Sequence, residues 1–306
     1  MVAICRKYSS DDYDRAVDFL RELYRASDGA PLWLPARFEY AEYLVSPLYM
    51  HRGLAIDWKE AIYLWETNNG EIAAILCSEN PDENIFIHTK PEFRYLEEVM
   101  VSVAEEEIVS GTLNKSTINI ECQSGDNYRE TVLQKRGYEK QTFVGYSNWR
   151  DLNEPLPEIE MPDGYTLQNM VSEEGLDLQH KIDRMTGAFD SESYPVDIYR
   201  NMQRAPSYRK EYDLYTTDIE GNVTSFCIIW YDDELNIGCF EPVGTDVNHR
   251  RKGLGRATLN AGLKILKQAG VNRAYVGSAG DYRRAFYHAS GFTNNIAFYP
   301  WMKKLK

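Results

Sequence analysis

The apolar positions of the chain change their period in its second half. Residues 235–243 (LNIGCFEPV) carry apolar side chains mostly on alternate positions, which predicts a strand. Residues 256–269 instead repeat with the period of a helix, and Gly270 supplies a stop. The expected polar stripe of this helix consists of Arg256, Asn260, Lys264 and Lys267. We therefore expect a strand that passes through a short connection into an amphipathic helix.

The same order of elements occurs twice along the chain. The strand, polar turn and strand predicted at residues 62–72 have a counterpart at residues 213–223, each with a glycine in the turn. Residues 125–138 likewise resemble residues 280–292, from a Gly-Asp pair to a Gly-aromatic pair. Because the two pairs of segments lie at nearly the same separation, we interpret the chain as two copies of one unit.

Each copy mixes strands and helices, which predicts an α/β fold (α+β, mixed sheet) with helices flanking a central sheet. At 306 residues the chain is long enough for two domains, each with its own core. A boundary is expected at residues 151–164 (DLNEPLPEIEMPDG), which are rich in proline and acidic residues and lack periodicity. The predicted domains are therefore residues 1–150 and residues 165–306, joined by this linker.

The connection between the predicted strand and helix is rich in glycine and cations, since residues 250–257 read RRKGLGRA. A helix N-terminus has unpaired N–H groups and a partial positive charge, so it binds phosphate. Side chains at Gly253 or Gly255 would keep such a ligand from the backbone. Two familiar nucleotide loops do not fit. The Walker loop ends in Gly-Lys-Ser/Thr, and the dinucleotide fingerprint needs a glycine at Thr258 and an acidic residue near Arg273.

The spacing of Arg250, Gly253 and Gly255 resembles Gln/Arg-x-x-Gly-x-Gly/Ala, motif A of the GNAT superfamily of acyl-CoA-dependent N-acetyltransferases. Residues 285–292 (AFYHASGF) are similar to motif B of that family. On these motifs, roughly residues 165–300 resemble a GNAT domain. The alternative is a solvated basic helix start without a ligand. The resemblance implies binding of acetyl-CoA by Val243, Arg250, Arg251, Lys252, Gly253, Leu254, Gly255, Arg256 and Ala257.

The resemblance also implies direct transfer of an acyl group, usually acetyl, from coenzyme A to an amine, with Tyr287 as the general acid toward the sulfur. A phenol and a thiol have comparable pKa values, so this proton transfer costs little. The alternative for Tyr287 is a core aromatic residue on an amphipathic helix. Glu241 shares the apolar face of the predicted strand and is the candidate base, unless it makes only a structural hydrogen bond or a water serves. His249 and Asp246 are weaker candidates.

Residues 187–195 (GAFDSESYP) are predicted to shape the amine site. Asp190 or Glu192 would pair with an ammonium group, and aromatic residues onward to Tyr208 and Tyr212 would enclose it. The alternative is an ordinary surface loop followed by a short helix.

The first copy lacks the glycines of motif A. Residues 88–98 (HTKPEFRYLEE) occupy the corresponding position and place acidic side chains in the opening helix turns. Those carboxylates suit a helix N-terminus but repel a pyrophosphate. We interpret residues 1–150 as a degenerate GNAT-like unit that keeps the fold without the cofactor.

Composition and charge limit the classes of molecule that the protein is expected to bind. The formal net charge of −13 argues against nonspecific binding to nucleic acid and would favour a cationic small molecule. The sequence contains no apolar run of membrane-spanning length and no signal-like N-terminus, so we expect a cytoplasmic protein that does not bind membranes. The five cysteines form no CxxC or Cys/His cluster, so no metal site is expected. No sequence pattern indicates an oligomeric state.

Two functions from different classes fit these patterns. One is an N-acetyltransferase that moves an acetyl group from acetyl-CoA to a small-molecule amine through a ternary complex. The other is a noncatalytic acyl-CoA-binding module with a regulatory role. Tyr287 favours the enzyme, because a mere binding module has no need of a phenol near the sulfur.

Overall fold

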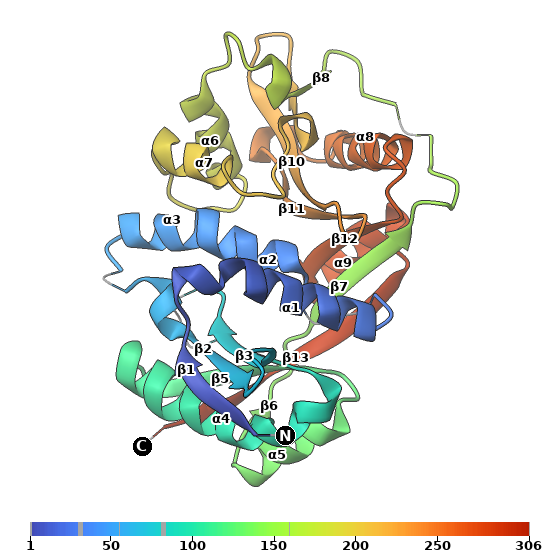
Figure 1. The fold of residues 1–306 in the computed structure, drawn as a ribbon. Helices are drawn as coiled ribbons and strands as arrows, with labels where there is room; N and C mark the ends of the chain where they lie inside the picture. The colour runs from blue at the N-terminus through green and yellow to red at the C-terminus, as the bar shows by residue number, and fades with distance from the viewer. Residues whose placement is uncertain (1, 30–32, 55, 81–83, 159, 306) are drawn as a thin grey trace. The chain divides into compact units, whose positions relative to one another are not determined.

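The computed structural model describes residues 2–29, 33–54, 56–80, 84–158 and 160–305, and it divides into two compact units. The first unit comprises Met1–Tyr146 together with Ile296–Lys306, and the second comprises Ser147–Asn295. Each unit contains a mixed sheet with helices on both faces (Figure 1), so the predicted α/β fold class is confirmed. No helix in the described ranges is long and apolar enough to cross a membrane.

The sheet of the first unit is antiparallel except at one pair of strands. Its order is β1-β2-β3-β4-β5-β13, and β6 also pairs with β13. The pairing of β4 with β5 is parallel. All residues of β3 are buried, as expected for a central strand covered on both faces. The strands are β1 (Ala3–Lys7), β2 (Ile62–Thr67), β3 (Ile72–Ser78), β4 (Asn84–Thr89), β5 (Thr117–Gln123), β6 (Glu139–Lys140) and β13 (Asn294–Lys304).

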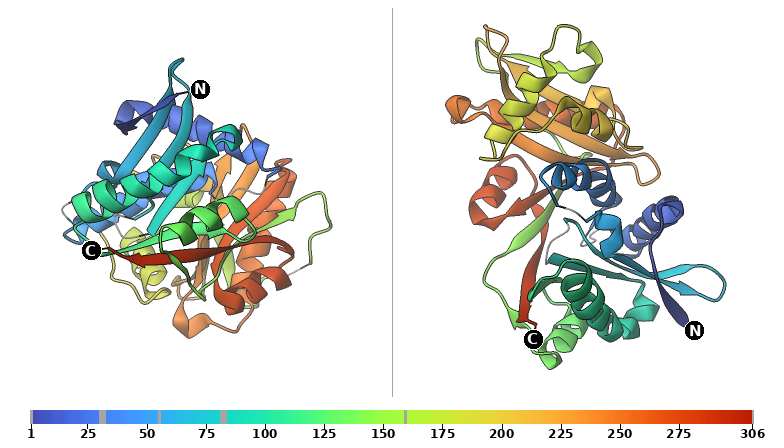
Figure 2. Two further views of the ribbon diagram at one scale, coloured as in Figure 1. Left: turned by 90° about the horizontal axis from the view of Figure 1, so that it is seen from below. Right: turned by 90° about the vertical axis from the view of Figure 1, so that its left-hand side faces the viewer.

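Helices α1 and α2 cover one face of this sheet, and α4 and α5 cover the other (Figures 1 and 2). Phe38 of α2 packs with Leu20 and Ile75 in the core of the first face. Met100 and Leu133 pack with Leu76 in the core of the second face. The helices are α1 (Tyr13–Ala26), α2 (Pro35–Tyr40), α3 (Ser46–His51), α4 (Glu97–Val103), which continues as the π-helix η5 (Ala104–Thr112), and α5 (Asn127–Lys135).

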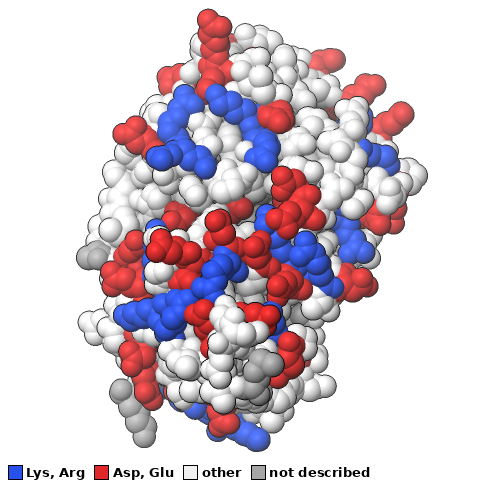
Figure 3. Space-filling view, viewed as in Figure 1, with Lys and Arg blue, Asp and Glu red and all other residues white. Residues whose placement is uncertain are grey.

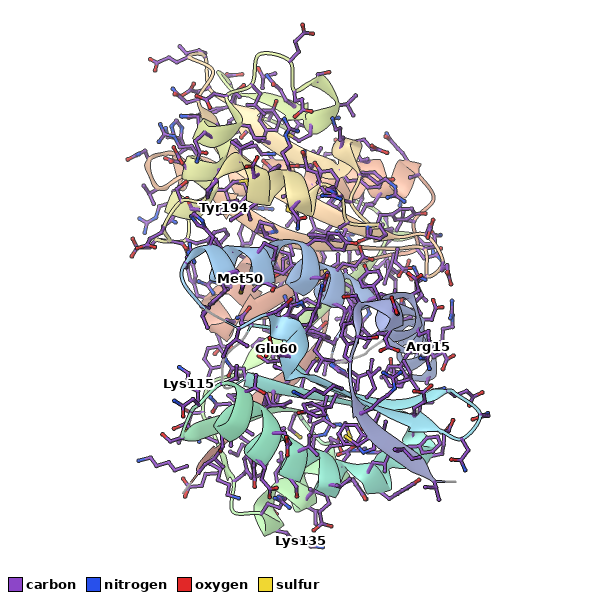
Figure 4. The ribbon with its side chains drawn as sticks, turned by 60° about the vertical axis from the view of Figure 1, so that its left-hand side comes forward. Arg15, Met50, Glu60, Lys115, Lys135 and Tyr194 are labelled. Carbon is purple, nitrogen blue, oxygen red and sulfur yellow. The ribbon has the colours of Figure 1, made fainter. Side chains whose placement is uncertain are left out.

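Arg15 ties α1 to the hairpin of β2 and β3 (Figure 4). Its guanidinium donates to Glu66 at 2.7 Å and to the carbonyl of Gly70 at 2.6 Å. Asp12 accepts from both Arg6 and Arg15, and the hydrogen bond from Arg6 holds the pKa of Asp12 well below its usual range. The face seen in Figure 3 carries both acidic and basic side chains, which lie close together over its middle.

The sheet of the second unit has the order β7-β12-β11-β10-β9-β8. Only the pairing of β11 with β12 among the registered pairs of this unit is parallel. The strand predicted at residues 235–243 is β11, which begins and ends two residues later. The strands are β7 (Gly145–Asp151), β8 (Thr166–Asn169), β9 (Asp213–Thr217), β10 (Val223–Asp232), β11 (Ile237–Thr245) and β12 (Arg273–Ala279).

Helix α8 packs against β9, β10 and β11, and α6 contacts β10 from the opposite face (Figures 1 and 2). Leu259, Leu263 and Leu266 carry the apolar side of α8 into the core. Asn260 is only 2% exposed, which corrects its predicted place on the polar stripe. Lys267 of α8 donates to the carbonyl of Glu154, in the segment before β8, at 2.7 Å. The helices are α6 (Leu178–Gly187), α7 (Val196–Met202), α8 (Leu254–Gln268) and α9 (Gly280–Ala289).

The strands at the ends of the two copies do not stay with the copy in which they occur. β13, at the end of the chain, pairs with β5 from Phe298 opposite Gln123 to Lys304 opposite Thr117, and so completes the first sheet. Residues 147–151 of β7 belong instead to the second unit, beside β12. Residues 152–164, most of the expected linker, also lie within the second unit.

Candidate active site

The two parallel strands of the second unit part at the middle of β11. β11 and β12 pair from Ile237 opposite Arg273 to Phe240 opposite Val276. On the other edge of β11, Ile229 lies opposite Phe240 whereas Cys227 lies opposite Val243, which marks a bulge on β11 at Glu241 and Pro242. A bulge re-aims side chains and ends regular pairing, and proline cannot donate to a ladder. Glu241 therefore stands where β11 leaves β12.

Helix α8 begins without a side-chain cap. Gly253 is its N-cap residue and has a left-handed backbone, with φ of 85°. The first helical hydrogen bond runs from the N–H of Ala257 to the carbonyl of Gly253, at 3.0 Å. The N–H groups of residues 254–256 therefore have no acceptor within the helix. This is the arrangement that binds an anion at a helix N-terminus.

Cations surround this helix start without carboxylate partners. The side chains of Arg250, Arg251, Lys252 and Arg256 are exposed, and none of them forms an ion pair within the described ranges. Arg250 donates to the carbonyls of Thr245 at 3.3 Å and Ala188 at 2.7 Å. Lys252 donates to the hydroxyl of Tyr165 at 3.1 Å. Two of the four cations are thus positioned by neutral oxygens and keep their charge unneutralised.

The two glycines of the motif have local structural reasons as well. At Gly253 the positive φ strains any side chain, whatever the ligand. A Cβ at Gly255 would lie 3.0 Å from the Oγ1 atom of Thr245 and 3.5 Å from the ring of Phe286. Gly255 therefore lets α8 approach β11 and α9. Other members of the predicted set serve the core: Leu254 and Ala257 are buried, and Val243 packs against the same cluster.

Tyr287 lies on α9 with its ring in the core and its hydroxyl unbound. Its side chain is 9% exposed, with ring centroids 5.1 Å from Phe286 and 6.1 Å from Phe292. Among the described residues, none hydrogen-bonds its hydroxyl. Burial first, and then the charge of Glu241, raise the pKa of Tyr287 well above its usual range. Tyr287 and Glu241 are therefore electrostatic neighbours, and the core packing predicted as the alternative for Tyr287 is also present.

The candidate bases differ in how they are held. Glu241 is half-buried, and its carbonyl accepts from the indole of Trp230 at 2.7 Å. Asp246 is buried, pairs with Arg184 at 3.1 Å and caps the short helix η8 (Val247–His249). His249 contacts the hydroxyl of Tyr165 at 3.1 Å through Nδ1. Asp246 and His249 thus help to fix the loop before α8.

The predicted substrate segment forms a turn between α6 and α7. Asp190 and Glu192 are both exposed, and Asp190 has a left-handed backbone with φ of 54°. Tyr208 is engaged elsewhere, because its hydroxyl donates to Asp213 at 2.7 Å. Tyr212 packs against Tyr231, with centroids 5.8 Å apart.

A buried charged cluster near this segment escapes the sequence analysis. Lys181 of α6 and Asp213 of β9 are both fully buried, and the ammonium donates to the carboxylate at 2.6 Å. Lys181 also donates to Tyr199 at 2.7 Å and lies over the ring of Tyr215, 4.9 Å from its centroid. Burial lowers the pKa of Lys181. No motif marks this lysine, since its partners come from α7 and β9, far from it in the sequence.

At the corresponding helix start in the first unit, that of α4, the cations form ion pairs with carboxylates of the same unit. Glu97, at the start of α4, is fully buried and accepts from Arg94 at 2.8 Å and from Arg129 at 3.0 Å. Arg94 also donates to Asp126 at 2.6 Å. The cations here are neutralised by carboxylates, in contrast to those before α8. Nowhere in the described chain do three His, Cys, Asp or Glu side chains gather to hold a metal ion.

Comparison with known proteins identifies the second half of the chain. Residues 179–292, which include α8 and Tyr287, match the acetyltransferase (GNAT) family model. No curated protein matches the sequence.

Solved structures resemble the whole chain. A GCN5-related N-acetyltransferase from Sphaerobacter thermophilus matches with a TM-score of 0.69 and 16% identity, over 99% of this chain and 95% of that one. A tandem GNAT protein from the clavulanic acid biosynthesis pathway matches with a TM-score of 0.65 and 13% identity, over 99% and 98%. A GNAT-family acetyltransferase from Colwellia psychrerythraea matches with a TM-score of 0.54 and 14% identity, over 97% and 99%. At these identities the likeness concerns the fold. The family match thus covers residues 179–292, and along its whole length the chain has the fold of these tandem GNAT structures.

Proposed function

We propose that this protein is an N-acetyltransferase that moves an acetyl group from acetyl-CoA to the amine of a small molecule. The observation that carries the proposal is the uncapped start of α8, with four exposed cations around it that have no carboxylate partner among the residues that the structure describes. An N-terminus of this kind attracts a pyrophosphate through both its N–H groups and its charge. The match of residues 179–292 to the GNAT family model supports the use of an acyl-CoA.

The residues present fit this cosubstrate. The free N–H groups of residues 254–256 would hold a pyrophosphate, and Gly253 and Gly255 leave the approach to them open. Arg250, Arg251, Lys252 and Arg256 supply the counter-charge, and Val243, Leu254 and Ala257 shape the site mainly through their backbone. Bound acetyl-CoA supplies an acetyl group activated as a thioester.

Two side chains would handle the protons of the transfer. The new N–C bond requires the amine to lose a proton, which Glu241 accepts on its carboxylate, directly or through a water. The breaking C–S bond leaves a thiolate, which Tyr287 protonates from its hydroxyl. The raised pKa of Tyr287 keeps its hydroxyl protonated at neutral pH, but it also makes the buried phenol a weaker acid toward the thiolate than a free phenol would be. Asp190 and Glu192, exposed in the turn after α6, are the proposed partners of the substrate ammonium.

The first unit has a different role in this proposal. Glu97 and Asp126 already neutralise Arg94 and Arg129, so a pyrophosphate would have to displace the buried carboxylate of Glu97 and the half-buried one of Asp126. We therefore propose that the first unit is degenerate with respect to acyl-CoA. Acetyl-CoA then binds once per chain.

The direct test is an assay of thiol release from acetyl-CoA over a panel of amines: aminoglycosides, polyamines, amino acids and a basic peptide. We expect release that depends on both enzyme and amine, with a small-molecule amine as the best substrate. Binding of acetyl-CoA without release for any amine would favour the noncatalytic acyl-CoA-binding module. Release only with the peptide would refute the small-molecule class.

A further inference from the structure

The turn that follows α6 is linked to the loop before α8 by two arginines that reach in opposite directions. Arg184 of α6 reaches Asp246 of the loop, with 3.1 Å between its Nη1 atom and the carboxylate. Arg250 of the loop reaches back and donates from Nη2 to the carbonyl of Ala188, the C-cap residue of α6, at 2.7 Å. Both contacts lie within the second unit. We name residues 188–192 the α6 turn.

The guanidinium of Arg250 divides its nitrogens between two backbone carbonyls and a free position. Its Nε atom donates to the carbonyl of Thr245, at the end of β11, at 3.3 Å, while Nη2 holds Ala188. None of the described residues accepts a hydrogen bond from Nη1, and the side chain is exposed. A guanidinium presents its donors in a rigid fork, so it can span two carbonyls and still contact an anion.

The α6 turn carries the groups proposed to bind the amine. Asp190 and Glu192 are exposed. Phe189 is 49% exposed, and its ring centroid lies 5.9 Å from that of Phe226 on β10. Phe226 is opposite Gly244 of β11, just beyond the bulge that contains the candidate base. An aromatic face beside carboxylates suits an ammonium group. The turn therefore presents these side chains next to the part of β11 that follows the candidate base.

Little burial holds the α6 turn in place. Ala188 is buried, whereas residues 189–193 are exposed. Asp190 has a left-handed backbone with φ of 54°, which is uncommon for a residue other than glycine. The amides of residues 188–191 donate only to carbonyls of residues 184–187, so they do not attach the turn to the sheet. A hydrogen bond from a charged group is stronger than one between neutral groups, and the one from Arg250 attaches the turn to the loop before α8.

We propose that Arg250 is a positioning residue for the amine substrate, because it holds the α6 turn against the loop that binds acetyl-CoA. This inference rests on the proposed function. The sites of the two substrates then share one guanidinium, and a positive charge alone cannot replace it. A lysine keeps the charge for the pyrophosphate, but its single nitrogen cannot span the carbonyls of Thr245 and Ala188 as the fork does.

The first test measures hydrogen exchange of the full chain without ligand, by mass spectrometry of peptides that span residues 186–193. The amides of residues 188–191 are hydrogen-bonded, so their exchange requires the α6 turn to open. In Arg250→Lys they should exchange about tenfold faster than in the wild type. Because the pair of Arg184 with Asp246 remains, exchange in β10 should be unchanged. The matched control is Arg209→Lys, since Arg209 also donates to two backbone carbonyls, at 2.6 Å and 2.9 Å, but in the loop before β9.

The second test separates the two substrates in the same variants. In Arg250→Lys the KM for the amine should rise about tenfold, while kcat and the dissociation constant of acetyl-CoA change by less than about threefold. Arg209→Lys should match the wild type. The proposal is overturned if the α6 turn exchanges equally fast in both variants, or if Arg250→Lys keeps the wild-type KM for the amine. Absence of thiol release from the wild type would refute the proposed function and not the link itself, which the exchange rates decide.

Discussion

The ring of Tyr287 is packed in the core, whereas its hydroxyl has no hydrogen-bond partner among the described residues. Removing the hydroxyl alone therefore separates a catalytic role from a structural one. Tyr287→Phe removes the hydroxyl and leaves the ring, so packing should survive while protonation of the thiolate does not. A positioned general acid contributes about a hundredfold to ten-thousandfold, and the single-turnover rate of thiol release should fall by such a factor with little change in acetyl-CoA affinity.

The matched control is Tyr282→Phe on the same helix, where the side chain is 88% exposed and should not matter. Because the pKa of Tyr287 is raised, its proton is retained through neutral and mildly alkaline pH, and titration of Tyr287 should not reduce activity below about pH 10. If Tyr287→Phe keeps the wild-type single-turnover rate, Tyr287 is not the general acid and has only a structural role.

His88 makes stability depend on pH. Its pKa is about 3 in the folded state and about 6.5 when unfolded, so below pH 6.5 the unfolded chain takes up a proton that the folded chain refuses. Stability is therefore lost as the pH falls. Between pH 7 and pH 5 this linkage removes about 2 kcal/mol from the free energy of unfolding.

Chemical unfolding of His88→Gln should lose about 2 kcal/mol less than the wild type over this pH interval. His51→Gln, at an exposed position, should keep the wild-type dependence. Equal pH dependence in His88→Gln and the wild type would show that His88 is not buried as a neutral ring.

At the scale of elements, Lys181 joins α6 to α7 and β9 through Tyr199 and Asp213. Lys181→Met leaves the Asp213 carboxylate buried without its ammonium, which typically costs about 3–5 kcal/mol of stability. The double variant Lys181→Met with Asp213→Asn should lose less, because it removes both charges. Lys135→Met, on the outside of α5 (Figure 4), should change stability by less than about 0.5 kcal/mol.

Urea unfolding of these three variants checks the argument. If Lys181→Met is no less stable than Lys135→Met, the buried pair does not hold these elements together.

The sequence was most informative about elements whose signal is local. The period change between residues 235–243 and residues 256–269 predicted β11 and α8 to within two residues, because alternation and helical stripes need no partner. Asn260 shows the limit, since the helical stripe predicted it as exposed whereas it is 2% exposed in the folded chain. The positions of β7 and β13 in the sheets could not be predicted either, because an alternating pattern predicts a strand but not the strand with which it pairs.

At the scale of the whole molecule, two copies of one fold have opposite charge arrangements at equivalent helix starts. The sequence of the first copy showed that the motif glycines are absent and that acidic residues are present. It did not predict the ion pair between Glu97 and Arg129, because Arg129 lies on another helix. In the second copy, the cations at the start of α8 have no carboxylate partner within the described ranges. The sequence could thus suggest which copy holds the cofactor, and the structure supplies a physical reason.

The central claim is that acetyl-CoA binds once per chain, at the start of α8, and calorimetric titration of the wild type and Arg256→Glu tests it. Arg256 is exposed in the first turn of α8 and has no ion pair among the described residues. Reversing its charge therefore changes the attraction for the ligand without straining the backbone, whereas any side chain at Gly253 would strain it. We predict one site per chain, with affinity reduced by about tenfold or more in Arg256→Glu and unchanged in Lys135→Glu. Two equivalent sites, or wild-type affinity in Arg256→Glu, would contradict the account.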